Sequence, residues 1–377
     1  MRAHIREASA LEKRTLGSAR ILRGVETFAR TDKNTAVTHD VWDADPMLLG
    51  TPGGVVDLRT GIMAKADPAS MMTRSTVVSP AGGKPECWCQ FIQEVTNGDG
   101  DLANYIQRVL GYCLTGSTRE HALFQAIGEG GNGKSVLLNT AGRILGDYAT
   151  TAGMETFTAA KGDRHPTDIA RLDGARLVAA SETTEGRAWD EARIKQLTGG
   201  DRIAARYMRQ DFFEFTPLFK LLIVANHPPV LRQVDAAMRR RFHVIPFNHK
   251  PAKPDPDLEE KLASEHPQIL AWMIDGARKW VADGLCPPAA VAVATEQYLA
   301  GEDVLGQWLD DECSRDNPTA LTLKSKAYES WARFARDNGQ EPGTQNSLTR
   351  NLERRGIHER RTSMGRFYVG LQMGMTQ

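Results

Sequence analysis

Cysteine, net charge and long apolar runs are what this sequence has least of, and each shortage excludes a class of protein. Its five cysteines are scattered over 377 residues without a C-x-x-C pair, so neither a disulfide framework nor a zinc site is expected. No apolar run approaches the roughly 18 residues that cross a bilayer, and the charged N-terminus lacks the hydrophobic stretch of a secretory signal. We therefore expect reduced thiols, no membrane partner and a cytoplasmic protein.

The whole-chain charge does not indicate a partner, because Lys+Arg and Asp+Glu both number 47. Binding to a polyanion must therefore be recognised from local clusters of basic residues. Hydrophobic residues make up 41% and charged residues 25% of the chain, which is ordinary for a globular protein. A chain of this length is expected to form about two to four domains.

The most informative stretch is residues 122–135, which read ALFQAIGEGGNGKS. It matches G-x-x-x-x-G-K-[ST], with an apolar strand before the pattern and helical spacing after it. Small residues let backbone N–H groups surround phosphate oxygens, and the N-terminus of the following helix also favours an anion. We expect Lys134 to contact the β- and γ-phosphates of ATP and Ser135 to ligate Mg²⁺. The other residues of this expected phosphate-binding loop are Gly128, Gly130, Gly131, Asn132 and Gly133.

Two later apolar strands end on polar side chains. Residues 175–182 end at Glu182, and the strand within 218–228 ends at Asn226. We expect Glu182 to orient the attacking water or to hold Mg²⁺ through water, although Ser181 stands where a second carboxylate would strengthen a metal site. A neutral amide at Asn226 can hydrogen-bond the γ-phosphate or that water. The alternatives are a solvent-exposed glutamate and an ordinary turn asparagine.

Three consecutive arginines, residues 239–241, precede a short apolar strand in RRRFHVIPF. In a monomer, such a cluster is usually a solvated surface. In a ring ATPase, an arginine from one subunit reaches the neighbouring active site and stabilises charge on the transferred phosphoryl group.

Between Glu182 and Asn226, residues 202–216 alternate as two strands around Arg209-Gln210-Asp211. Basic side chains with interleaved aromatic residues suit phosphate contacts and base stacking on single-stranded DNA. An ordinary hairpin with core aromatics is the alternative. The basic candidates are Arg206, Arg209 and Lys220, and the aromatic ones are Tyr207, Phe212 and Phe213.

A basic module is expected near the C-terminus. A helix at 347–355 presents Arg350, Arg354 and Arg355, and two short strands follow around Met364-Gly365. This is the element order of a winged helix, and residues 347–368 hold six arginines against two glutamates. That local excess is typical of a DNA-binding surface. A winged helix that binds protein is the alternative.

Five ordered motifs resemble those of superfamily 3 helicases. More narrowly, they resemble the helicase half of phage and plasmid primase–helicases, which are related to the poxvirus primase–helicase. The resemblance covers residues 48–250 well and the C-terminal module more weakly. Upstream, GTPGGVVDLRTG and IQRVLGYCLTG resemble the small helical domain that precedes the motor. The five motifs are GEGGNGKS, LVAASE, IKQLTGGDRIAARY, LLIVANHPP and DAAMRRRFHVIPF.

The resemblance implies an α/β fold with an AAA+-like P-loop ATPase core, an N-terminal α-rich domain and a C-terminal winged-helix domain. The expected boundaries are a helical segment at 1–45, a small α-rich domain with a β-hairpin at 46–118, the ATPase at 119–250, a helical linker or lid at 251–300 and the winged helix at 301–377.

The resemblance further implies an ATP-dependent replicative DNA helicase that works as a ring, with a hexamer expected, on single-stranded DNA at a replication fork. Arg240 and Arg241 match the arginine pair from which one residue acts on the neighbouring subunit, and Arg239 leaves the choice open. The implied unwinding polarity is 3′ to 5′, and the implied location is a bacterial host cytoplasm.

Longer relatives carry a primase-polymerase domain, for which residues 1–45 are too short. We therefore expect any primase to be a separate chain. Two other functions stay open: an origin initiator that uses ATP as a switch and unwinds little, and a P-loop ATPase unrelated to DNA.

Overall fold

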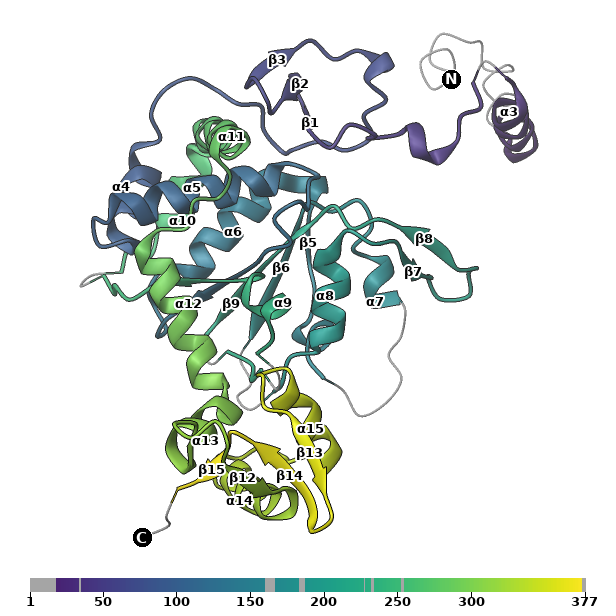
Figure 1. Cartoon of the computed structure of the whole chain (residues 1–377). Helices are drawn as coiled ribbons and strands as arrows, with labels where there is room; N and C mark the ends of the chain where they lie inside the picture. The colour runs from purple at the N-terminus through teal and green to yellow at the C-terminus, as the bar shows by residue number, and fades with distance from the viewer. Residues whose placement is uncertain are drawn as a thin grey trace, which may run out of the picture.

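The computed structural model describes residues 18–33, 35–159, 167–182, 187–226, 228–231, 234–251 and 254–374. A sheet of parallel strands lies at its centre (Figure 1). The strand order is β10-β4-β9-β6-β5. Because every neighbouring pair is parallel, the carboxyl ends of the strands meet at one edge, where open α/β sheets bind ligands. The strands are β4 (Leu123–Ile127), β5 (Ala149–Thr151), β6 (Leu177–Glu182), β9 (Lys220–Ala225) and β10 (Phe242–Pro246).

Helices cover both faces of this sheet. Successive residues of a strand point to opposite faces, so Phe124 belongs to one hydrophobic core and Leu123 to the other. This double burial explains why the strands read as continuous apolar runs. The first face packs on α4 (Glu86–Val95), α5 (Gly100–Leu114), α6 (Lys134–Leu145) and α11 (His266–Asp283), and the second on α7 (Thr167–Ala170), α8 (Glu191–Gly199) and α9 (Ala236–Arg239).

Helices α5 and α11 cross where each has a glycine. A Cβ added to Gly111 would lie 2.1 Å from the backbone nitrogen of Ala277, and one added to Gly276 would lie 2.1 Å from the carbonyl oxygen of Gln107. Only residues without a side chain permit this approach. Helix α11, which follows the parallel sheet in the chain, therefore packs directly on a helix that precedes the sheet. None of the described helices is long and apolar enough to cross a bilayer.

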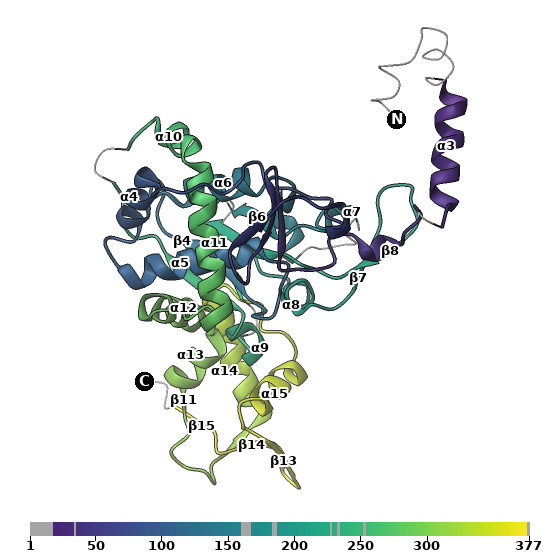
Figure 2. The same ribbon diagram turned by 90° about the horizontal axis from the view of Figure 1, so that it is seen from above.

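The region before α4 contains a small antiparallel sheet and a separate helix. The expected hairpin at 46–66 is a sheet in the order β1-β2-β3, with β1 at Leu48–Thr51, β2 at Gly54–Asp57 and β3 at Ile62–Ala64. Helix α3 (Ala19–Thr31) has no buried residue, and both views show it set apart from the rest of the chain (Figures 1 and 2). Residues 1–17 of the expected N-terminal helical segment lie outside the described residues.

The C-terminal module has a hydrophobic core of its own, in which Trp308, Leu352 and Tyr368 are buried. The helix expected at 347–355 is α15, and the two strands expected around Met364 pair antiparallel. Helix α12 (Ala289–Glu302) connects this module to the sheet (Figure 1). The module contains α13 (Val304–Glu312), β11 (Cys313–Ser314), β12 (Leu321–Leu323), α14 (Lys324–Asp337), α15 (Gln345–Glu353), β13 (Glu359–Thr362), β14 (Gly365–Val369) and β15 (Gln372–Met373).

Candidate active site

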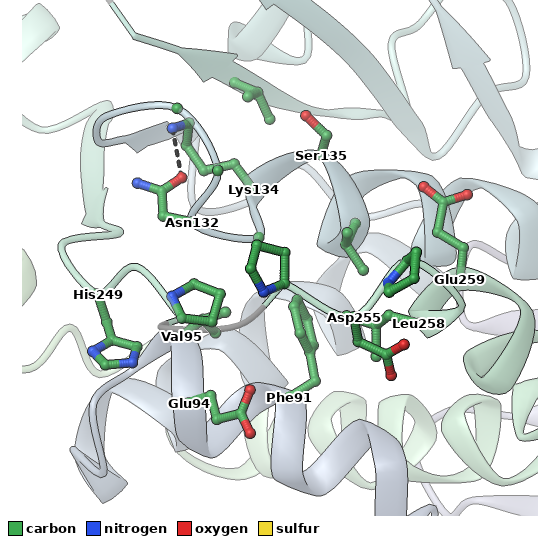
Figure 3. Close-up of a pocket in the computed structure, with 18 of the residues that line it drawn as sticks. Phe91, Glu94, Val95, Asn132, Lys134, Ser135, His249, Asp255, Leu258 and Glu259 are labelled. Carbon is green, nitrogen blue, oxygen red and sulfur yellow. Dashed lines mark hydrogen bonds between the residues drawn. The ribbon is translucent and has the colours of Figure 1, made fainter.

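The loop between β4 and α6 closes around the ammonium group of Lys134 (Figure 3). Its Nζ donates to the carbonyl oxygens of Gly128 and Glu129, at 2.5 and 3.0 Å, and to Oδ1 of Asn132 at 2.8 Å. Desolvation lowers the pKa of this buried amine. Ser135 follows in the first turn of α6 and is exposed. A cation beside the unpaired N–H groups of a helix N-terminus is an arrangement that binds anions.

Two glycines fix the path of this loop. Gly133 has a φ of +86°, and a Cβ there would lie 2.7 Å from Val95 Cγ1 and 2.9 Å from Phe91 Cε2. A Cβ on Gly128 would lie 2.1 Å from the carbonyl oxygen of Phe247. The loop therefore rests on α4 at one end and on the residue after β10 at the other. A larger residue at either glycine would displace it.

A pocket of about 890 Å³ opens beside the loop, and Ser135, Ser181 and Asn226 are among its lining residues. Asn226 directly follows β9, and Ser181 is the penultimate residue of β6. The structure therefore brings the expected phosphate loop, Ser135 and Asn226 together at the carboxyl edge of the sheet. Glu182 ends β6 next to Ser181, but its side chain lies outside what the structure describes, so its role stays a prediction.

The same pocket continues into an apolar compartment. Phe91 and Val95 of α4 line it, as does Leu258 at the start of α10 (Leu258–Ser264) (Figure 3). Helix α4 is held firmly, because both carboxylate oxygens of Glu265 accept hydrogen bonds from its first turn, from the backbone N–H groups of Cys87 (3.0 Å) and Trp88 (2.9 Å). Three prolines, Pro251, Pro254 and Pro256, also line the pocket.

The three consecutive arginines have three different environments. Arg239 pairs with Glu296 at 2.6 Å. Arg241 is only 6% exposed, and its guanidinium donates to Thr198 Oγ1 (3.0 Å) and to the carbonyl oxygen of Ala237 (2.8 Å). Arg240 is exposed, and no ion pair or side-chain hydrogen bond joins it to another described residue. Arg241 therefore does not project from the surface, which corrects its inclusion as a candidate for reaching a neighbouring subunit.

The chain resembles known protein families in two regions. The family described as "D5 N terminal like" matches residues 2–97, and a family of unknown function matches residues 126–241. A protein of Acanthamoeba polyphaga mimivirus, provisionally named a helicase, is 26% identical over 74% of this chain. A protein of African swine fever virus, provisionally named a primase, is 22% identical over 77% of it. This chain is therefore similar to the D5-like primase–helicases, in their helicase portion.

These D5-like relatives are much longer than the chain, which covers 32% of the mimivirus protein and 33% of the swine fever virus protein. A helicase-named protein of Invertebrate iridescent virus 6 is 28% identical over 76% of this chain, and 34% of its own length is covered. Among solved structures, the apo form of the NrS-1 C-terminal region aligns over 93% of this chain and 89% of its own, with 13% identity and a TM-score of 0.49.

The hairpin of this D5-like chain is formed by β7 (Ile203–Ala205) and β8 (Phe213–Phe215), which pair antiparallel. Arg206 and Arg209 lie in the exposed connection between the strands. The Arg206 guanidinium lies 4.8 Å from the ring centre of Phe212, which is 63% exposed. Tyr207 stacks on Phe213 instead. The hairpin therefore offers solvent two cations and an aromatic ring, which suits binding to single-stranded nucleic acid.

Two other expected DNA contacts of this D5-like chain are corrected by the structure. Lys220 is 1% exposed, its ammonium donates to the carbonyl oxygens of Thr115, Ser117 and Leu218, and burial lowers its pKa to about 7. It anchors β9 to the end of α5. Arg355 is partly buried and pairs with Asp303 at 2.5 Å. Arg350 and Arg354 are exposed on or next to α15.

The apolar compartment of the pocket was not expected from the sequence. Phe91 and Val95 are four residues apart, which is the spacing of an ordinary helix core, and both are almost fully buried. Their closeness to Gly133 arises from folding, because α4 and the phosphate loop are about 40 residues apart in sequence. The signal that was present is the density of prolines after β10, in KPAKPDP.

Proposed function

We propose that this chain is an ATP-dependent DNA helicase of the superfamily 3 type, with an AAA+-like core and active sites completed between subunits of a ring. One observation carries the proposal: the Lys134 ammonium group, held by three oxygens of a glycine loop, next to Ser135 and within the pocket that Asn226 also lines. The names of the D5-like relatives support a role in replication.

The triphosphate of ATP would lie along the loop at the start of α6. Its oxygens would replace the carbonyl oxygens of Gly128 and Glu129 as partners of Lys134. A phosphate is a better partner for a desolvated ammonium group than a neutral carbonyl, so binding would reverse the lowering of the Lys134 pKa. Asn132 would stay in place, since its amide also donates to the carbonyl oxygen of Phe247.

The residues present fit Mg²⁺, which is usually held by a few protein oxygens and by the phosphates themselves. The Ser135 hydroxyl would be the direct ligand, and Ser181 lines the same pocket. Within the described ranges, no group of three or more His, Cys, Asp and Glu residues could hold a metal without such help. Bound Mg²⁺ would neutralise phosphate charge. Glu182 would orient the attacking water, and the Asn226 amide would hydrogen-bond the γ-phosphate.

The adenine base would enter the apolar compartment between α4 and α10. Phe91 offers an aromatic surface there, and Val95 and Leu258 complete the walls. This placement gives the D5-like N-terminal region, which ends at residue 97, a direct part in nucleotide binding. Glu94 of the same helix also lines the pocket (Figure 3). Its carboxylate is a hydrogen-bond acceptor suited to an exocyclic amino group.

Replacing Phe91 by alanine is expected to raise KM for ATP about tenfold with little change in kcat, because an aromatic contact of this kind contributes roughly 0.5–1.5 kcal/mol beyond burial. Phe91→Leu should keep most of the affinity. Binding of ribose triphosphate, which has no base, serves as the control and should not change. If Phe91→Ala weakened both ligands equally, Phe91 would act by supporting Gly133 and not by holding the base.

Single-stranded DNA would pass the hairpin loops, where Arg206 and Arg209 contact phosphates and Phe212 stacks on bases. Removing both arginines is expected to weaken binding and to reduce the salt dependence of log K by about 0.7 per lost contact. The matched control is Arg202→Ala, because Arg202 lies at the base of the same hairpin and is paired with Glu214 at 3.7 Å. Equal losses in the control and the double variant would indicate a general charge effect.

The C-terminal module has the element order of a winged helix, and we propose that α15 and the strands after it contact DNA through Arg350 and Arg354.

A tailed-duplex displacement assay tests the proposed function as a whole. We expect ATP-dependent displacement by the wild-type chain on any tailed sequence. Melting restricted to particular sequences would favour the origin initiator instead, and absence of DNA binding at low salt would favour an ATPase unrelated to DNA.

A further inference from the structure

Helix α12 contacts the segments that follow β6 and β9, two strands whose carboxyl ends lie at the candidate active site. The Tyr298 hydroxyl donates to the carbonyl oxygen of Pro229 at 2.7 Å and accepts from the indole N–H of Trp189 at 2.9 Å. Pro229 lies three residues after Asn226, and Trp189 lies seven residues after Glu182. One hydroxyl group therefore connects the segment that follows β6 to the segment that follows β9.

Backbone contacts around this hydroxyl strengthen the connection. The Trp189 N–H donates to the carbonyl oxygen of Val230, and the Val230 N–H donates to that of Arg187, so the two segments pair for a short distance. Trp189 is 2% exposed and packs its ring against Phe242. One turn further along α12, Glu302 Oε2 accepts from the Leu231 N–H at 2.7 Å. These contacts fix the backbone on both sides of the Tyr298 hydroxyl.

We propose that Tyr298 is a positioning residue for the proposed ATP hydrolysis, and that it acts through Asn226 and Glu182 without touching the nucleotide. Glu182 and Asn226, at the ends of neighbouring strands, must keep a fixed position relative to each other if they are to hold a water and a phosphate side by side. Small displacements of such groups have large effects on rate. Tyr298 is absent from the pocket lining, whereas Asn226 is part of it.

The same helix joins this control point to the DNA-binding module that we propose. Asp303 follows α12 directly, caps α13 by accepting from the Gly306 N–H, and pairs with Arg355 next to α15. The module is therefore connected through α12 to both loops of the ATP site.

The experiment compares two deletions of a hydroxyl group from the same helix in the full chain. Tyr298→Phe keeps the ring and removes the link between Trp189 and Pro229. Thr295→Val is the matched control, because its Oγ1 accepts from the buried N–H of Val244 in β10, at 2.9 Å, away from either loop. Both variants leave a buried N–H group without its partner, so both are expected to lower Tm by similar amounts.

Only Tyr298→Phe is expected to reduce kcat, by about tenfold, while KM and the affinity for a fluorescent ATP analogue change less than about twofold. Equal kcat values in the two variants would overturn the positioning role and leave the ATPase assignment standing. The inference rests on the proposed function, and absence of Lys134-dependent hydrolysis in the wild-type chain would overturn both.

Discussion

Replacing Lys134 by alanine is expected to reduce kcat for the proposed ATP hydrolysis by about a thousandfold. The Lys134 ammonium is a charged donor fixed at the place where negative charge would gather, and removing one such donor typically costs about 10²–10³ in rate. The loss should lie at the upper end of that range, because no second buried cation is among the described residues that line the pocket. Phosphate release, measured with and without single-stranded DNA, tests this expectation.

The control is Lys261→Ala, which removes the same charge from the rim of the same pocket. Lys261 is exposed and pairs with Asp255 at 2.6 Å, and an exposed ion pair contributes little to stability or binding. We expect its kcat to stay within a few-fold of the wild-type value. Wild-type turnover in Lys134→Ala, with the control equally active, would show that the glycine loop is not the site of hydrolysis.

Local pattern was sufficient to predict the elements around Lys134. The helix after the loop, the hairpin at 202–216 and the C-terminal helix with two strands depend on contacts between residues near one another in sequence. The strand before the loop pairs with distant strands, but it is recognisable as an apolar run because both of its faces are buried. Apolar periodicity and glycine positions carry that information directly. The Asn226 placement follows from the same logic, because parallel strands bring their carboxyl ends to one edge.

The partners of buried cations could not be predicted in this way. Lys220 begins an apolar strand, and its hydrogen bonds go to Thr115 and Ser117, about 100 residues earlier. Nothing in the stretch LFKLLIVANHP distinguishes a lysine that meets DNA from one that meets backbone carbonyls. Arg176 behaves similarly, since it is 2% exposed and donates to the carbonyl oxygens of Leu114 and Leu48. Such contacts are set by tertiary packing.

The different environments of the three consecutive arginines also could not be predicted from the sequence. Arg239, Arg240 and Arg241 lie at the end of a short helix, where consecutive side chains point about 100° apart. One of them meets α12, one enters the core and one faces solvent. The sequence identifies the cluster, but only the packing of α9 against α8 and α12 separates its members.

Arg240→Ala is expected to leave assembly intact and to reduce ATP hydrolysis by about 10³-fold, because an arginine supplied to a neighbouring site contributes that much to phosphoryl transfer. Arg239→Ala should have a small effect, since it breaks only an exposed pair with Glu296. Arg241→Ala should instead lower Tm, because it leaves Thr198 and Ala237 without their buried partner.

Mixing two inactive proteins separates this role from any effect within one subunit. Arg240→Ala keeps its own phosphate loop, and Lys134→Ala keeps its arginine. In a head-to-tail ring assembled at random from equal amounts, about one quarter of the interfaces combine both intact parts. Hydrolysis should therefore return to about that fraction of the wild-type rate, and dilution below the assembly concentration should abolish it. If no activity returned from rings shown to contain both variants, Arg240 would act within its own subunit.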